Sequence, residues 1–192
     1  MAVCKGDRDF RMEKLYITHY CYPGTDPWKN IMLLPEEEAF RKAEELARSH
    51  PDTTSFGRFA DFRNYYPERK KADAFVRGEF IRLGGKPKLI HPYSFTLMEC
   101  ECLRKWFDSV DQITMDLDGI PEDQVSFTLG DSCALMNHGK EPVVLTKKLL
   151  LERIEACGGS VEAFLEESLG GYAYVEVQLW DRIRQCTEVP GR

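Results

Sequence analysis

The sequence predicts an α+β fold in one domain over residues 1–192, with a mixed or mostly antiparallel sheet of about five strands and helices packed on it. Segments in which apolar and polar residues alternate, as in strands, are bunched along the chain and not separated regularly by helices. The length of 192 residues suits one substantial core, and a hydrophobic content of 43% is normal for a globular protein. Residues 1–12 are polar and mixed in charge, so we expect an arm and not a secretory signal.

The first half of the chain is expected to hold a strand, two helices and a second strand. Pro23-Gly24 ends the first strand, because proline lacks a donor and glycine tolerates tight turns. Pro35 and Pro67 each suit the start of a helix, and Gly84-Gly85 ends the second helix because glycine adopts the left-handed conformation at little cost. Residues 52–64 are expected to be a loop or a short helical turn. The expected strands are 14–22 and 89–98, and the expected helices are 35–50 and 67–83.

The second half is expected to hold three more strands and three short helices. Alternation marks the strands, and residues 130–142 between them are expected to form a loop. Thr146 and Ser160 can cap two of the helices, because their hydroxyl groups accept bonds from the first turn. The expected strands are 111–117, 125–129 and 172–180, and the expected helices are 101–107, 147–157 and 160–169.

The last expected strand carries the first candidate site. One face is apolar and is expected to be buried, whereas the other carries Tyr174, Glu176, Gln178 and Trp180. A solvated face ordinarily carries Lys, Thr and Ser. A carboxylate among aromatic rings therefore indicates a place where a ligand hydroxyl or a cation could bind. The alternative is that Glu176 is a half-exposed strand residue paired with a cross-strand Lys or Arg.

His19 lies on the apolar face of the first strand and is followed by Tyr20. Because histidine titrates near neutral pH, His19 is a candidate for orienting a ligand or for acid–base chemistry. The alternative is a core histidine whose ring nitrogens bind backbone groups.

A basic segment over residues 58–88 carries nine basic and four acidic residues, in a chain whose net charge is −6. Arg63 and Arg69 lie there among aromatic residues, which suggests an anion pocket in which guanidinium groups grip phosphates. The alternative is a solvated helix face whose side-chain stems cover apolar surface. The acidic balance of the whole chain makes a nucleic-acid partner improbable.

The seven cysteines are scattered and odd in number, which favours free thiols in a reducing cytoplasm. Cys100-Glu-Cys102 lacks a second pair for zinc, so we interpret both residues as isolated core thiols and expect no metal site. No apolar run approaches the roughly 18 residues that cross a membrane, so no membrane partner is expected.

Four phrases resemble a family of bacterial proteins that brings no established activity. They are Leu15–Tyr20, Phe80–Pro87, Val125–Asp131 and Tyr174–Trp180. A second resemblance is to ADP-ribosyltransferase-like proteins, which place a histidine on an early strand, an aromatic ring over nicotinamide and a glutamate on a late strand. This resemblance implies NAD as cofactor, with His19 holding a ribose, Tyr20 over the nicotinamide and Glu176 stabilising the developing positive charge.

No nucleophile–base pair, metal set or phosphate loop is visible in the sequence. We therefore expect a cytoplasmic α+β protein that binds a small molecule or a protein partner without catalysis and without a cofactor. The alternative is an NAD-using enzyme with Glu176 and His19 in its site.

Overall fold

The computed structural model describes residues 14–106, 110–170, 174–183 and 187–189. The α+β prediction is confirmed. The strands of the described residues are β1 (Tyr16–Cys21), β2 (Tyr93–Leu97), β3 (Asp111–Asp116), β4 (Val125–Leu129), β5 (Val144–Thr146), β6 (Val175–Leu179) and β7 (Thr187–Val189). They form one sheet in the order β5-β4-β6-β2-β1-β3-β7, in which all neighbouring strands are antiparallel. The two strands beyond the expected five, β5 and β7, have three residues each and are too short to show alternation.

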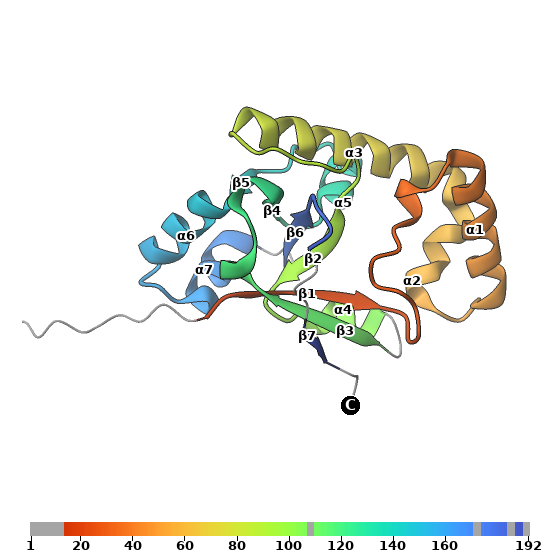
Figure 1. Ribbon diagram of the computed structural model, residues 1–192, viewed down its shortest axis with the longest axis horizontal. Coiled ribbons are helices and arrows are strands. Elements are labelled where there is room, and N and C mark those ends of the chain that lie inside the picture. The colour runs from red at the N-terminus through yellow and green to blue at the C-terminus, as the bar shows by residue number, and fades with distance from the viewer. Residues whose placement is uncertain (1–13, 107–109, 171–173, 184–186, 190–192) are drawn as a thin grey trace, which may run out of the picture.

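The helices surround this sheet on several sides (Figure 1). They are α1 (Glu36–Ser49), α2 (Thr54–Gly57), α3 (Phe62–Arg82), α4 (Glu101–Trp106), α5 (Ser132–Asn137), α6 (Lys147–Ala156) and α7 (Val161–Leu169). Short 3-10 turns occur at Ile31–Leu33, Arg58–Asp61, Leu117–Gly119 and Glu122–Gln124. The predicted caps of α6 and α7 are confirmed, because the hydroxyl groups of Thr146 and Ser160 accept bonds from Leu149 N and Ala163 N.

Two helix predictions are wrong. Helix α3 begins at Phe62, so Pro67 lies inside it and not at its start. The reason is that α2 and the following 3-10 turn lead directly into α3, and this helical path is already established before the proline. The expected loop over 130–142 contains α5, whose first turn is capped by the carboxylate of Asp131, 2.9 Å from Ala134 N. The expected arm over 1–12 and residues 107 and 172–173 lie outside the described residues.

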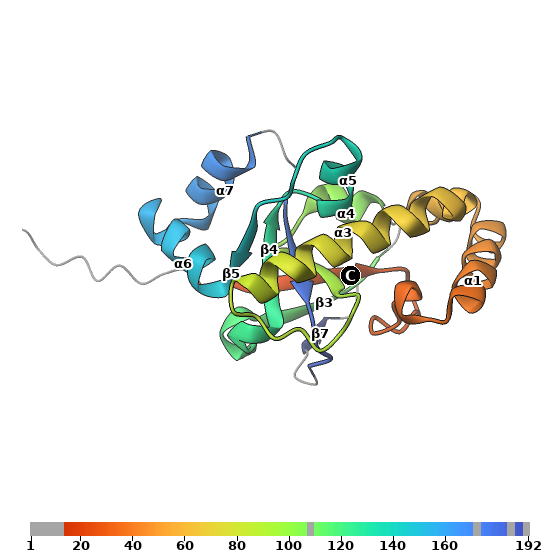
Figure 2. The same cartoon turned by 90° about the horizontal axis from the view of Figure 1, so that it is seen from above.

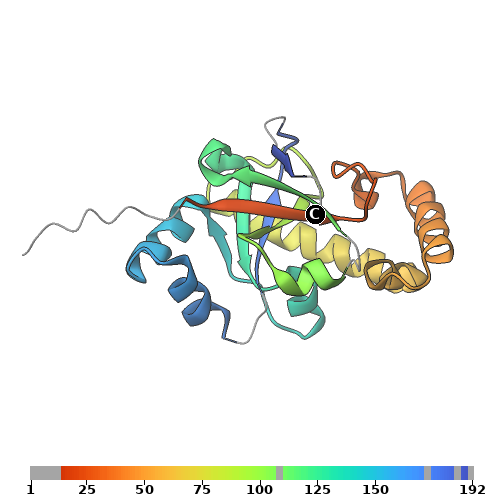
Figure 3. The ribbon, with the colours of Figure 1, turned by 90° about the horizontal axis from the view of Figure 1, so that it is seen from below.

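The apolar face of the sheet forms the main core. Val175, Val177 and Leu179 of β6 lie in the middle of this core and are fully buried. Helices α6 and α7 cover this face with four buried side chains. These are Leu150, Ile154, Val161 and Phe164. In Figure 3 the strands β1 and β3 are the part of the sheet nearest the viewer, and α3 lies on the far side.

The opposite face of the sheet is covered by α3 and α5, and Figure 2 shows α3 running across the strands. The prediction that the last strand buries only one face is therefore wrong, because all five residues of β6 are buried. Helix α3 points a regular stripe of buried side chains inward, at spacings of three and four residues. The stripe consists of Phe62, Tyr66, Arg69, Asp73, Val76 and Phe80.

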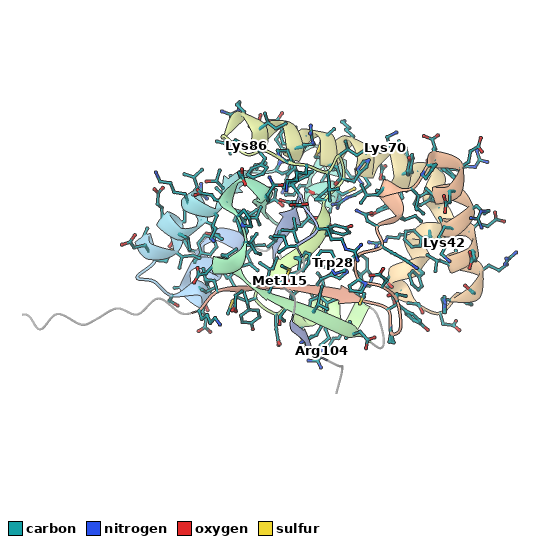
Figure 4. The ribbon with its side chains drawn as sticks, viewed as in Figure 1. Trp28, Lys42, Lys70, Lys86, Arg104 and Met115 are labelled. Carbon is teal, nitrogen blue, oxygen red and sulfur yellow. The ribbon has the colours of Figure 1, made fainter. Side chains whose placement is uncertain are left out.

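A second core lies beside the sheet in what we call the helical lobe, residues 31–66, seen at the right of Figure 1. Its centre is aromatic: the ring of Phe40 on α1 lies 5.1 Å from Phe62 and 5.3 Å from Tyr66. Helix α3 thus packs in two places: its first turns contribute to the core of the helical lobe, and its last turns lie over the sheet. Trp28 lies between the sheet and the lobe (Figure 4).

Candidate functional site

Glu176 lies on β6 beneath α3, and its side chain is only 3% exposed. Its Oε1 accepts bonds from both terminal nitrogens of Arg69, each at 3.2 Å, and from the hydroxyl group of Ser94 at 3.3 Å. Its Oε2 accepts a 2.8 Å bond from the backbone N–H of Ser132, at the start of α5. Both oxygens are therefore bound to groups of the protein, and the carboxylate does not face an open cavity.

Arg69 connects Glu176 to two further buried ionisable residues. Its Nε lies 2.8 Å from Oδ1 of Asp73, one turn along α3, and Oδ2 of Asp73 lies 2.6 Å from Nδ1 of His91. Burial opposes the charge on Arg69, but the carboxylates of Asp73 and Glu176 outweigh burial and hold the pKa of Arg69 well above its ordinary value. The guanidinium therefore stays charged and forms ion pairs with both acids. We call His91, Asp73, Arg69 and Glu176 the buried charge chain.

The other residues on the same face of β6 form a neutral row of hydrogen bonds. Gln178 donates to Thr128 Oγ1 and accepts from Ser126 Oγ, both at 2.9 Å. Trp180 donates its indole N–H to Ser126 Oγ at 2.9 Å, and its ring stacks on Phe80 of α3. These groups satisfy one another inside the protein, as buried polar groups usually do.

Tyr174, directly before β6, donates its hydroxyl group to Oδ2 of Asp131 at 3.0 Å. Burial and the nearby carboxylates of Asp131 and Glu176 raise the pKa of Tyr174 above its ordinary value, so the phenol stays protonated. Tyr174, Gln178 and Trp180 thus make their bonds to other groups of the protein, to Asp131, Thr128 and Ser126, and the structure gives no direct bond from them to Glu176.

His19 and Glu176 lie on opposite faces of the sheet. Thr18 is paired with Thr96, and Thr96 is paired with Glu176, so these three side chains share a face. His19 follows Thr18 and points to the other side, where its ring lies 5.1 Å from Phe95. One ligand cannot contact both side chains in this arrangement, because the sheet separates them.

His19 is held by the backbone, as in the core-histidine alternative. Its Nδ1 lies 2.7 Å from the carbonyl oxygen of Ser94, which can only accept, so Nδ1 carries the hydrogen. Burial lowers the pKa of His19 below its ordinary value and favours the neutral ring. Tyr20 lies on the face of Glu176, but its hydroxyl oxygen accepts a 2.7 Å bond from Cys100 N.

Arg63 and Arg69 have different surroundings, although both come from the basic segment. Arg69 is buried in the charge chain, whereas Arg63 is exposed and lines a groove between α1 and α3 of about 420 Å³. The groove is lined by Glu36, Phe40, Arg63, Tyr66, Pro67 and Lys70. Figure 4 shows Lys70 near the end of α3 that meets α1. A second hollow of about 320 Å³ beside α6 contains no aromatic ring.

Neither Asp73 nor His91 was selected as a site residue from the sequence. A usable signal was present, because Arg69 and Asp73 stand one turn apart on the stripe that buries Phe62, Tyr66, Val76 and Phe80. Charged residues on a buried stripe require partners inside the protein. Across the described ranges, no group of three or more His, Cys, Asp or Glu side chains is arranged to hold a metal ion.

Comparisons of the chain with protein-family models, with curated proteins and with solved structures found no match. None of the described helices combines the length and the apolar composition that crossing a bilayer requires.

Proposed function

We propose that this protein is a binding domain without catalytic activity, and that its ligand occupies the groove between α1 and α3. The proposed ligand is a small molecule in which a phosphate or carboxylate group stands next to an aromatic ring. The observation that carries this proposal is the combination of two exposed cations and two aromatic rings in one groove of about 420 Å³. Ligand sites commonly have volumes of roughly 300–1,000 Å³, with apolar linings and few polar groups.

The spacing of the lining residues supports a groove built from two helix faces. On α3, Arg63, Tyr66, Pro67 and Lys70 stand at positions i, i+3, i+4 and i+7, which lie on one side of a helix. On α1, Glu36 and Phe40 are one turn apart in the same way. Phe40 also packs edge-on against Tyr66, so the rings connect the two helices.

The cations of the groove are available to an anion. Within the described residues, Arg63 takes part in no ion pair or hydrogen bond. Lys70 lies 3.8 Å from a carboxylate oxygen of Glu36, with both side chains about half exposed or more, and 5.1 Å from the ring of Tyr66. Exposed ion pairs of this kind contribute little, so a ligand anion can replace Glu36 at small cost.

The buried charge chain supports a role without catalysis. The carboxylate of Glu176 is enclosed and neutralised by Arg69, so it has no free side for a substrate. The alternative of an NAD-using enzyme needs His19 and Glu176 at one ligand, and these residues lie on opposite faces of the sheet. We also propose a reducing, cytoplasmic location, which the free thiols of the described cysteines support.

Thermal unfolding of the full chain with three probes tests the proposed ligand class. Adenosine monophosphate joins a ring system to a phosphate, whereas adenosine and inorganic phosphate supply each part alone. A ligand that binds only the folded state raises Tm through mass action. We expect adenosine monophosphate to raise Tm more than either part does at the same concentration.

Two substitutions on α3 locate the site. Arg63→Ala should abolish the Tm shift, whereas Lys71→Ala, an exposed residue of the same helix outside the groove, should preserve it. The proposal fails if no probe raises Tm, or if the shift survives both Arg63→Ala and Lys70→Ala.

A further inference from the structure

Cys100 and Cys102 form a thiol pair at the junction of β2 and α4. Their sulfur atoms lie 2.9 Å apart, Cys100 is buried, and Cys102 is exposed. The interpretation of both residues as isolated core thiols is therefore wrong. Cys100 directly precedes α4 and Cys102 lies in its first turn, so the contact forms where the chain enters this helix.

The backbone around the pair is fixed by the sheet. Met98 has φ of 59°, and it is the only residue other than glycine with positive φ among the described residues. Two bonds hold Met98 there: its N–H donates to Tyr16 O at 2.9 Å, and its carbonyl accepts from Thr96 Oγ1 at 2.8 Å. Cys100 is held in turn, since its N–H donates to the hydroxyl oxygen of Tyr20. An unfavourable conformation that persists in this way is often connected with function.

We propose that Cys100 and Cys102 form a reversible disulfide by exchange with a small-molecule disulfide of the glutathione class. The exposed Cys102 thiolate attacks one sulfur of the small disulfide, which breaks its S–S bond and releases the first small thiol. Cys100 then attacks Sγ of Cys102 in the mixed disulfide and releases the second small thiol. The two protein thiols lose two electrons and two protons, which reduce one small disulfide to two thiols.

The environments of the two sulfurs fit this order of events. Cys102 is accessible to a small molecule, whereas Cys100 is covered and already in contact with Cys102. Burial raises the pKa of Cys100 to about 11, so at neutral pH this thiol is almost entirely protonated and does not compete for the first attack. In the second step Cys100 attacks through its small thiolate fraction, and its proton leaves with the second small thiol.

The other described cysteines lack these features. Cys21 and Cys133 are buried, and burial raises the pKa of both thiols. Cys157 is partly exposed, but its thiol donates to a carboxylate oxygen of Glu167 at 3.3 Å. Among the described residues, Cys100 and Cys102 are therefore the pair in which an exposed thiol lies next to a second thiol.

The test incubates the full chain in buffers with defined ratios of glutathione to glutathione disulfide, followed by acid quenching, alkylation and peptide mass spectrometry. The expected result is joint loss of both alkylatable thiols in the peptide that holds Cys100 and Cys102, without retained glutathione. Excess glutathione should restore both thiols. Cys100→Ser should instead retain glutathione on Cys102, because the resolving thiol is absent.

Cys100→Ser changes a buried side chain and could impair folding, so a second variant is needed. Cys102→Ser changes an exposed side chain and should fold as the wild type does. This variant should leave Cys100 reduced in the same buffers. The proposal is overturned if the wild type stays reduced at every ratio, if it keeps a stable glutathione adduct on Cys102, or if Cys100 of the Cys102→Ser variant reacts as fast as the wild-type pair. A Cys157→Ser control should react as the wild type does.

Discussion

Arg69 and Glu176 form a buried ion pair that joins the middle of α3 to the middle of β6, with 3.2 Å between Nη1 and Oε1. The two residues are separated by 107 positions in the chain, so the contact exists only in the folded protein. A buried pair adds little net stability compared with well-packed apolar residues, but loss of one partner leaves a buried charge uncompensated. Movement of α3 away from β6 would therefore leave the buried carboxylate of Glu176 without its cation.

Replacement of Glu176 by Gln should destabilise the protein by about 3 kcal/mol. The amide keeps the size of the carboxylate, but its NH₂ group must face either the guanidinium of Arg69 or the N–H of Ser132, and both are donors. Urea unfolding at pH 7 measures the effect. Glu79→Gln is the matched control, since the only ion pair of half-exposed Glu79 among the described residues is with exposed Arg82, and its cost should stay within about 0.5 kcal/mol.

Replacement of Arg69 by Met should cost about 3–5 kcal/mol at pH 7, because Asp73 and Glu176 lose their shared cation. Buried carboxylates without a cation have raised pKa values in the folded state. As pH falls, these carboxylates take up protons in the folded state before they do so in the unfolded chain, and protonation removes the uncompensated charge. The stability lost by Arg69→Met should therefore become smaller as pH falls from 7 towards 5. Urea unfolding across this range tests the trend. Adding Asp73→Leu and Glu176→Met to Arg69→Met should recover part of the loss. A deficit that grows at lower pH contradicts this account.

Stability should also depend on pH through His19. Burial lowers the pKa of His19 in the folded state, so the unfolded chain takes up a proton first as pH falls below about 6.5. The free energy of unfolding is therefore not reduced by His19 above pH 6.5. Below that pH it falls, with a slope of at most about 1.4 kcal/mol per pH unit. His19→Asn keeps a donor near Ser94 but does not titrate. Urea unfolding at pH 7.5 and pH 5.5 should show a smaller loss for His19→Asn than for the wild type. His138→Asn, at an exposed position, should behave as the wild type does.

Two glycines near the end of α3 should respond to alanine with opposite signs. Gly78 is exposed inside the helix and has no atom within 4 Å of a new Cβ, so Gly78→Ala should stabilise by about 0.5–1 kcal/mol. A Cβ at Gly85 would lie 2.5 Å from the ring of the fully buried Phe80, so Gly85→Ala should destabilise by about 1–3 kcal/mol. Thermal unfolding of both variants tests the pair. If both variants changed Tm by the same amount and in the same direction, the ring of Phe80 would have to move away from the new Cβ at residue 85.

Local signals in the sequence predicted much of the fold. Thr146 and Ser160 mark the starts of α6 and α7 because a cap depends only on neighbouring residues. The end of α3 follows from Gly84-Gly85, where Gly84 has φ of 99° and Gly85 N bonds to Phe80 O. Helix α5 escaped prediction because it has only six residues, which show little periodicity.

The surroundings of Glu176 could not be predicted in the same way. Alternation along β6 shows which residues share a face, but it does not show which helix covers that face. The partner of Glu176 is a residue of α3, and the arrangement of α3 over β6 depends on the whole topology. Arg69 was singled out as an anion-binding residue, and its anions are the protein's own carboxylates.

The strands at both edges of the sheet, β5 and β7, are only three residues long. An edge of this length offers few unpaired backbone groups to a strand from another molecule, whereas the central strands of five or six residues are shielded between neighbours. The protein should therefore resist fibril growth by strand addition while it remains folded, and exposure of β6 on unfolding should be the step that makes it aggregate.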